Sequence, residues 1–328
     1  MRYGALTTPA RPLVESALLA ALGALFILVA FYVPLLGMFA TLISPLPTAF
    51  VVIRHGVRWG VLSSFVTLAV LFPFLSPITA ITLMTVYGTM GVALGYSVRR
   101  SLPAERTIGL MTGASMVGVA VDMLGAYLVT GLTLPQLAEQ TAKVFNEVFE
   151  MSQRIMGGNP ALEGMMQTVT PEMIMRTLPA GFLLGSLFLA WVNYEVVRRV
   201  LPRFGYTVEP LRPFSRWIMP EATGHVWLLA FVGLQLSPFY AEKLPFLAVV
   251  VDNVLPMAML VLLLDAASAL CFFLLRSGFA GGVAGLFTSM AVFMALSSPL
   301  LGFGAQLFGM IDVLFDLRRV RYPELSDI

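Results

Sequence analysis

Carboxylates inside apolar segments are the residues of this chain with the clearest capacity for chemistry. Asp122 and Asp265 each stand near the middle of a long apolar run. An unpaired charge at the centre of a membrane helix costs about 3 kcal/mol or more, so each carboxylate needs a partner or a function. Two interpretations stay open for both residues. Each takes part in binding a ligand, an ion or a proton, or each makes a structural hydrogen bond to a neighbouring helix.

The spacing around Asp122 predicts where this side chain points. One row of its helix holds Ala114, Gly118, Asp122 and Ala126. Residues four apart share a helix face, so Asp122 should face a neighbouring helix. Tyr127 lies about 140° further round the helix and is not a defined partner of Asp122. The candidate ligand-binding residues are Asp122, Tyr127, Asp265 and, in an outer turn, Pro34 and Gly37.

A second group of charges lies near the end of the last apolar segment. Asp312 and Asp316 are four residues apart, and Arg319 follows three residues later. Their spacing predicts one charged helix face at the edge of the membrane. This face is either structural or a docking surface.

No signature of catalysis accompanies these carboxylates. The sequence contains no His-Glu-x-x-His, no Gly-x-Ser-x-Gly and no Gly-x-x-x-x-Gly-Lys-Ser/Thr. The single cysteine, Cys271, excludes an intramolecular disulfide and a cysteine-based metal site. We therefore expect a protein that is not an enzyme, holds no cofactor or metal, does not bind nucleic acid, and cannot drive transport with ATP alone.

The composition identifies the elements that must position these residues. The chain has 328 residues, of which 58% are hydrophobic and only 12% are charged. This balance predicts an all-α bundle of about 8–10 transmembrane helices, since a water-soluble domain could not bury so much apolar surface. The predicted spans are 13–33, 38–53, 59–75, 77–98, 107–130, 176–197, 223–240, 245–275, 278–297 and 301–317. Pro45 and Pro47 should kink or unwind the second of them.

Basic residues predict the orientation of this bundle. With the N-terminus inside, sixteen of the twenty lysines and arginines fall in cytoplasmic segments. Such a bias predicts a plasma-membrane protein with both termini in the cytoplasm. One polar segment, 131–175, then lies on the outer face. Its apolar residues recur at helical spacing, so it should form an amphipathic helix that ends at Gly157–Pro160, before a new helix at Thr170–Pro171. It either lies on the membrane or the bundle, or forms a lid over an outward-facing cavity.

The first predicted helix carries small residues at a spacing typical of close helix packing. Ala17 is four residues from Ala21, and Ala20 is four residues from Ala24. Together with six predicted spans in residues 1–200, this alanine motif resembles the S-components of energy-coupling-factor vitamin transporters. The resemblance implies that the four alanines contact a transmembrane coupling subunit, which works with ATPases. It also implies that a small vitamin or metabolite binds near the outer surface.

The whole chain resembles the YybS-like family of bacterial membrane proteins. The matching features are Arg54-His55-Gly56, Gly91-Val-Ala-Leu-Gly95 before Arg99-Arg100, and the segment from Ile311 to Arg319. The insertion 131–175 and a C-terminal membrane region of about four spans, 201–328, depart from the six-helix pattern of the S-components.

These observations favour a small-molecule-binding subunit of a transport system whose substrate is unknown. One alternative is a non-catalytic membrane scaffold for envelope or cytoplasmic partners, a function that the distantly S-component-like shape-determining protein of the rod complex illustrates. A further alternative is an ion-coupled transporter, which would require Asp122 and Asp265 to line one water-accessible path.

Overall fold

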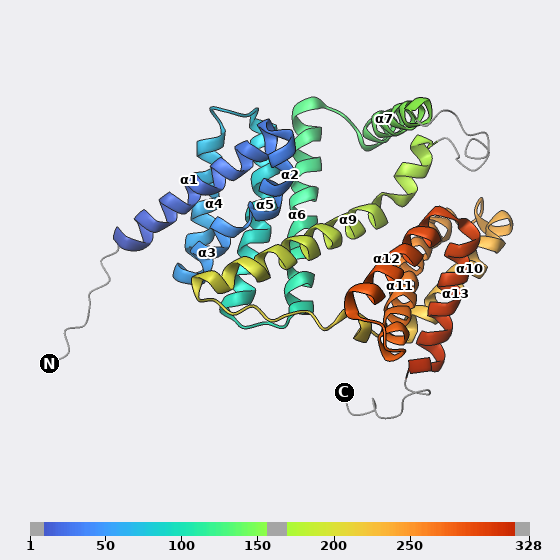
Figure 1. Cartoon of the computed structure of the whole chain (residues 1–328). Coiled ribbons are helices and arrows are strands. Elements are labelled where there is room, and N and C mark those ends of the chain that lie inside the picture. Colours follow the sequence, from blue (N-terminus) through green and yellow to red (C-terminus); the bar gives the residue numbers. More distant parts are fainter. Residues whose placement is uncertain (1–9, 156–168, 319–328) are drawn as a thin grey trace. The chain divides into compact units, whose positions relative to one another are not determined.

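A computed structural model of the chain describes residues 10–155 and 169–318 (Figure 1). Within those ranges the chain forms helices and no strand, which confirms the predicted all-α fold. The elements are α1 (Ala10–Tyr32), α2 (Pro34–Ile43), α3 (Leu46–His55), α4 (Val57–Leu71), α5 (Pro77–Arg99), α6 (Ala104–Thr130), α7 (Leu134–Ile155), α9 (Pro171–Val200), η1 (Leu201–Phe204), η2 (Phe214–Arg216), α10 (Ala222–Tyr240), α11 (Pro245–Arg276), α12 (Gly281–Ser297) and α13 (Pro299–Phe315).

Five stretches of helix are long and apolar enough to cross a membrane. They are Arg11–Tyr32, Pro77–Arg99, Ala104–Thr130, Pro171–Phe204 and Pro245–Arg276. Four shorter apolar helices accompany them: Phe39–His55, Val57–Leu71, Gly281–Ser297 and Pro299–Phe315. The chain is therefore an integral membrane protein by the length and composition of its helices.

Prolines and short polar side chains set the helix boundaries. Proline occupies the first helical position of α2, α5, α11 and α13, where its missing N–H group is not needed. The Ser76 side chain accepts a hydrogen bond from the Thr79 amide, and the Thr170 side chain accepts one from the Met173 amide. The predicted helix start at Thr170–Pro171 is thus confirmed. The predicted break near Pro45 is also confirmed, because α2 ends at Ile43 and α3 begins at Leu46.

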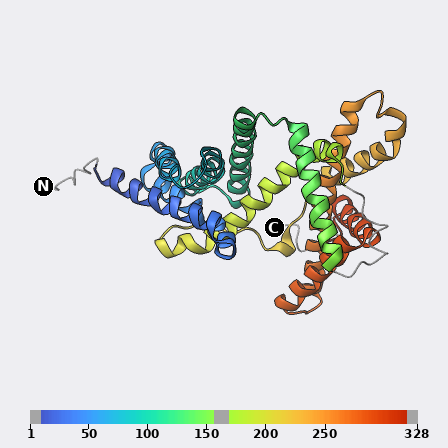
Figure 2. The same ribbon diagram turned by 90° about the horizontal axis from the view of Figure 1, so that it is seen from above.

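The chain divides into two compact units. Unit 1 comprises Met1–Met151 and Gly181–Pro210. In it α5 packs against α3, α4 and α6, while α1 packs against α2, α3 and α4. Figure 1 shows α4, α5 and α6 upright and side by side, and Figure 2 shows them nearly end-on, with α1 crossing obliquely. Ala24, Ile27, Leu71 and Met84 are among the residues that form an apolar core between α1, α4 and α5.

Unit 2 comprises Ser152–Ala180 and Leu211–Ile328. Its centre is α11, which contacts α10, α12, α13 and η2. The core between α10, α11 and α13 contains Trp227, Leu255, Leu262 and Val313. At Gly309 of α13 an added Cβ would lie 2.2 Å from the Leu262 carbonyl oxygen, so the two backbones approach as closely as only glycine allows.

Glycines spaced four residues apart on several helices divide into packed and open ones. An added Cβ at Gly91 would lie 2.6 Å from the Pro45 carbonyl oxygen, and one at Gly118 would lie 2.8 Å from the Val86 Cα. In contrast, an added Cβ would meet nothing within 4 Å at Gly109, Gly113, Gly181, Gly185, Gly281 or Gly285. A spacing of four residues is therefore not sufficient to identify a packing face, because it does not say whether a neighbouring helix is present.

The predicted amphipathic helix is α7, and its apolar side is exposed. Val144 and Phe145 are 58% and 59% exposed, whereas Ala138 and Ala142 are buried. The exposed apolar side agrees with the predicted amphipathic character of this segment. The predicted end of this helix at Gly157–Pro160 lies outside the described residues.

The Asn253 side chain supplies hydrogen bonds to backbone groups of α9 where Pro179 interrupts the helix. Proline has no N–H group and interrupts the hydrogen-bond ladder of a helix. The Asn253 amide of α11 enters this gap: its Nδ2 donates to the Arg176 carbonyl over 2.6 Å, and its Oδ1 accepts from the Ala180 amide over 2.8 Å. Asn253 therefore holds the first part of α9 to unit 2 and satisfies two backbone groups that would otherwise be unpaired.

Candidate functional site

The most highly charged buried cluster of the described chain surrounds Asp265 in unit 2. Asp265 lies on α11, Asp312 lies near the end of α13, and Arg318 follows α13. The exposed fractions of the three side chains are 0%, 2% and 2%. Taking three charged groups out of water is unfavourable unless they pair closely and form further hydrogen bonds. The contacts within the cluster are therefore its defining feature.

Arg318 connects the two carboxylates. Its Nη2 lies 2.9 Å from Asp265 Oδ1 and 2.7 Å from Asp312 Oδ2. Its Nε donates to Asp312 Oδ2 over 2.8 Å. The chain brings Arg318 back toward α11 because Asp316, with φ 47°, adopts a left-handed conformation at the end of α13. Asp312 is therefore buried inside the helix bundle, and the prediction that it shares an exposed face at the edge of the membrane with Asp316 is wrong. Arg319, the third member of the predicted face, lies outside the described residues.

The loop that contains η2 completes the cluster with backbone groups. The Met219 amide donates to Asp265 Oδ1 over 3.1 Å. The Trp217 carbonyl accepts from Arg318 Nη1 over 2.8 Å, and the Ser268 hydroxyl accepts from the same nitrogen over 2.9 Å. The cluster thus links α11, α13 and the 214–219 loop, and each nitrogen of Arg318 has an acceptor.

One oxygen of each carboxylate has no partner. Asp265 Oδ2 and Asp312 Oδ1 are both buried and lack a hydrogen-bond partner among the described residues. Two carboxylates face one guanidinium, so the ionised cluster carries one negative charge in excess. This imbalance can be removed by a bound proton or cation, whereas the three groups alone offer no activated nucleophile.

Asp122 contacts a neighbouring helix in unit 1. The Thr82 hydroxyl of α5 donates a hydrogen bond to Asp122 Oδ1. On the same row of α6 the Ala114 carbonyl accepts from the Thr89 hydroxyl over 2.9 Å. These bonds agree with the predicted row that faces a neighbouring helix. Tyr127 does not share this interface, since its side chain is 53% exposed.

The predicted ligand-binding residues lie on α2 and α6 of unit 1 and on α11 of unit 2. Asp122 and Tyr127 lie on α6, Pro34 and Gly37 lie on α2, and Asp265 lies in unit 2. Gly37 approaches the end of α1 closely, because an added Cβ would lie 2.5 Å from the Ala30 carbonyl oxygen. The turn at Pro34–Gly37 therefore fixes how α2 leaves α1.

The four alanines of α1 lie on two different faces. Ala20 and Ala24 are each 1% exposed and pack inside unit 1, where the Ala20 carbonyl accepts a hydrogen bond from Thr67 over 3.1 Å. Ala17 and Ala21 are exposed. Ala20 and Ala24 therefore serve the fold of the protein itself, and only the other two are available to a partner.

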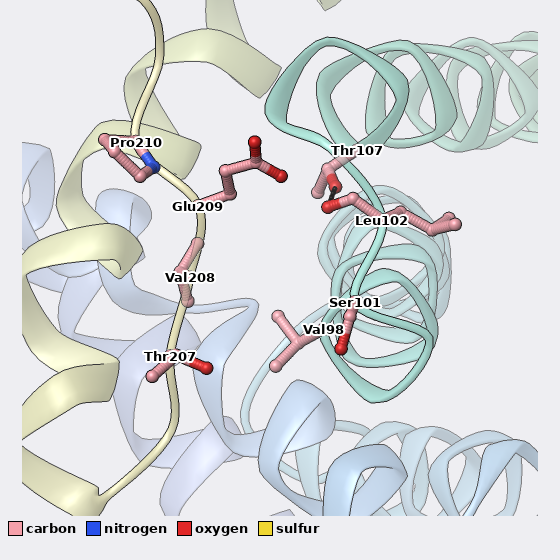
Figure 3. Close-up of a pocket in the computed structure, with 8 residues that line it drawn as sticks. All are labelled: Val98, Ser101, Leu102, Thr107, Thr207, Val208, Glu209 and Pro210. Carbon is pink, nitrogen blue, oxygen red and sulfur yellow. Dashed lines mark hydrogen bonds between the residues drawn. The ribbon is translucent and has the colours of Figure 1, made fainter.

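A pocket that the spacing of residues did not indicate lies beside the turn between α5 and α6. Its volume is about 270 Å³, and Figure 3 shows the Glu209 side chain directed from an extended segment toward this turn. The Tyr194 hydroxyl donates to the Glu209 carbonyl and so holds the segment in place. The lining residues are Val98, Ser101, Leu102, Thr107, Thr207, Val208, Glu209 and Pro210. In the sequence, this pocket was indicated only by Thr207 and Glu209, which lie in the segment between Pro202 and Pro210.

A second polar cluster joins three parts of unit 1. Glu15 Oε2 of α1 lies 2.9 Å from His55 Nε2 and 3.5 Å from Arg54 Nη1 of α3. Arg54 Nε also donates to the Tyr206 hydroxyl over 3.3 Å. No group of three or more His, Cys, Asp or Glu residues in the described ranges is arranged to hold a metal ion. This cluster is arranged to fasten α1 to α3.

Comparisons with known proteins agree with this membrane architecture. Residues 21–313 match a family described as predicted membrane protein (DUF2232). The chain is also 20% identical to the uncharacterized protein YybS of Bacillus subtilis (strain 168) over 312 residues, which cover 94% of this chain and 97% of that protein. No solved structure matches the chain. The resemblance to YybS-like proteins is confirmed, whereas the likeness to transporter S-components stays a prediction.

Proposed function

The chain belongs to the predicted membrane protein family DUF2232, and we propose that it is a non-catalytic, small-molecule-binding subunit of a transport system. In this proposal a transmembrane partner subunit and its ATPases supply the energy, since the sequence has no nucleotide-binding motif. The protein lies in the plasma membrane with both termini in the cytoplasm. The substrate class is a vitamin or another small metabolite.

The observation that carries this proposal is the division of the α1 alanines. Ala17 and Ala21 lie on the exposed side of α1, beside Leu18 and Leu25, which are 67% and 53% exposed. Lipid chains are as apolar as leucine, so association of helices in a membrane depends on close backbone approach at small residues. A transmembrane helix of a partner subunit can approach α1 more closely at Ala17 and Ala21 than at the leucines around them.

The test is copurification of the full chain in mild detergent from the membranes of its own host. Replacing Ala17 and Ala21 with Leu should reduce the recovered transmembrane partner at least tenfold and leave the melting temperature unchanged. A matched control, Leu18→Ile, keeps the bulk of the exposed face and should retain the partner. Replacing Ala20 and Ala24 with Leu should instead lower the melting temperature, because both are buried.

A second candidate function, a membrane scaffold, is favoured by the packing around Asp122. This side chain bonds to Thr82 within the α5–α6 interface, and Gly118 beside it leaves no space for even a methyl group. The same copurification separates the two functions. ATPase subunits and a retained small molecule in native mass spectra support transport. Envelope or cytoplasmic assembly proteins without a ligand favour the scaffold.

A further inference from the structure

Two unpartnered oxygens in the buried cluster of unit 2 are the basis of this inference. Asp265 Oδ2 and Asp312 Oδ1 have no hydrogen-bond partner among the described residues, and their side chains are 0% and 2% exposed. Their other oxygens accept from the same Nη2 of Arg318 at 2.9 and 2.7 Å. The two carboxyl groups are therefore neighbours on one nitrogen of Arg318.

Among the residues that the structure describes, the groups that contact this pair supply one positive charge, that of Arg318. The cluster receives Asp265 and Ser268 from α11, Asp312 from α13 and Arg318 from the residues that follow α13. The 214–219 loop adds uncharged peptide groups, namely the Met219 amide and the Trp217 carbonyl. Two ionised carboxylates against this one guanidinium would leave an excess negative charge among side chains that are only 0–2% exposed, which is strongly unfavourable.

We propose that Asp265 and Asp312 form a proton-binding site in which a single proton is shared between their two unpartnered oxygens. The proton converts one oxygen from an acceptor into a donor, so both oxygens become satisfied. It also leaves one carboxylate against one guanidinium. The site is independent of the docking face on α1 and holds whether or not a partner binds there.

Release of this proton would weaken the contact between α13 and α11. Two ionised carboxylates would repel each other beside Arg318, and this arginine is the link between them and the Trp217 carbonyl. The bound proton is a ligand of the folded state. Its stabilising contribution is therefore present at low pH and is lost as pH rises through its release.

The experiment is infrared spectroscopy of the full-length protein in detergent, in H₂O and in D₂O, over a range of pH. The wild-type chain should show a protonated carboxyl band that shifts in D₂O and vanishes at high pH. Asp265→Asn and Asp312→Asn should each abolish this band, because each leaves a one-to-one ion pair. Asp122→Asn is the matched control, since it removes an aspartate from another candidate span and should leave the band in place.

Thermal unfolding gives a second readout of the same site. The melting temperature of the wild-type chain should fall as pH rises, and that of Asp312→Asn should be flat over the same range. The same band and the same slope in Asp312→Asn would overturn the proposal. So would a melting temperature that follows sodium concentration instead of pH, or loss of the folded state at neutral pH in both asparagine variants.

Discussion

Asp122 in unit 1 and Asp265 in unit 2 are the same residue type in two candidate membrane spans, yet their surroundings differ completely. Asp122 is partly buried and receives one hydrogen bond from the neutral Thr82. Asp265 is fully buried, accepts from a backbone amide and pairs with Arg318, which also pairs with Asp312. A carboxyl with one neutral donor serves as a packing contact. A carboxyl that shares its counter-ion with a second carboxyl holds three segments together, and its charge state affects the stability of that contact.

The largest expected effect comes from Arg318. Replacing it with Met removes the counter-ion of the buried Asp265–Asp312 pair, which should destabilise the fold by about 3–5 kcal/mol. Unfolding of the detergent-solubilised protein measures this loss. Adding Asp265→Asn and Asp312→Asn to the same chain should recover most of it, because no buried charge then remains. A triple variant as unstable as Arg318→Met would show that shape, not charge, holds the cluster.

Asn253 is an uncharged polar side chain in a candidate membrane span, and its expected effect on stability is intermediate between those of the Asp265 cluster and Asp122. Asn253→Leu should cost about 2 kcal/mol of unfolding free energy, because the Arg176 carbonyl and the Ala180 amide both lose a partner. The control is Asp252→Asn next to it. Its ion pair with Arg176 spans 3.6 Å and is partly exposed, so the change should be within about 0.5 kcal/mol. Equal losses in the two variants would contradict the role assigned to Asn253.

Gly118 tests how tightly the Asp122 interface is packed. Gly118→Ala places a methyl group 2.8 Å from the Val86 Cα, so α5 and α6 must separate, at a cost of about 1–3 kcal/mol. Gly113→Ala on the same helix meets nothing within 4 Å and should be neutral or slightly stabilising. Unfolding of both variants under one condition checks the difference. A neutral Gly118→Ala would mean that this interface is looser than the structure shows.

The smallest effect is expected for Asp122 itself. Asp122→Asn keeps an oxygen that can accept from Thr82, so the unfolding free energy should change by less than about 1 kcal/mol. A ligand retained by the wild-type protein in native mass spectra should still be retained by this variant. Loss of that ligand at unchanged stability would return Asp122 to the ligand-binding residues and weaken its contrast with Asp265.

The sequence predicted what depends on local chemistry. Helix starts at Thr170–Pro171, the break near Pro45 and the row that carries Asp122 all follow from short spacings and backbone preferences. The helical class follows from composition. These features need no knowledge of which helices are neighbours.

The sequence did not predict contacts that depend on distant segments. Arg318 pairs with Asp265 across 53 residues, and the pairing requires the left-handed turn at Asp316, which no pattern indicated. The spacing of four residues predicted the same packing role for Ala17 and Ala20, although only Ala20 is buried inside unit 1. The pocket beside Glu209 was missed because a short polar loop gives no periodic signal. Membrane helices share one apolar composition, so composition cannot select their partners.

The 53-residue separation of Asp265 and Arg318 also has a consequence for synthesis of the protein. At ribosomal rates of about 5–20 residues per second, Asp265 is made roughly 3–10 seconds before its counter-ion. During that interval α11 must enter the membrane with this carboxyl protonated, or wait at its surface until α13 is complete. The last helix, α13, and Arg318 after it are thus the last parts of the cluster to be synthesised. Unit 2 can reach its native form only when both have packed against α11.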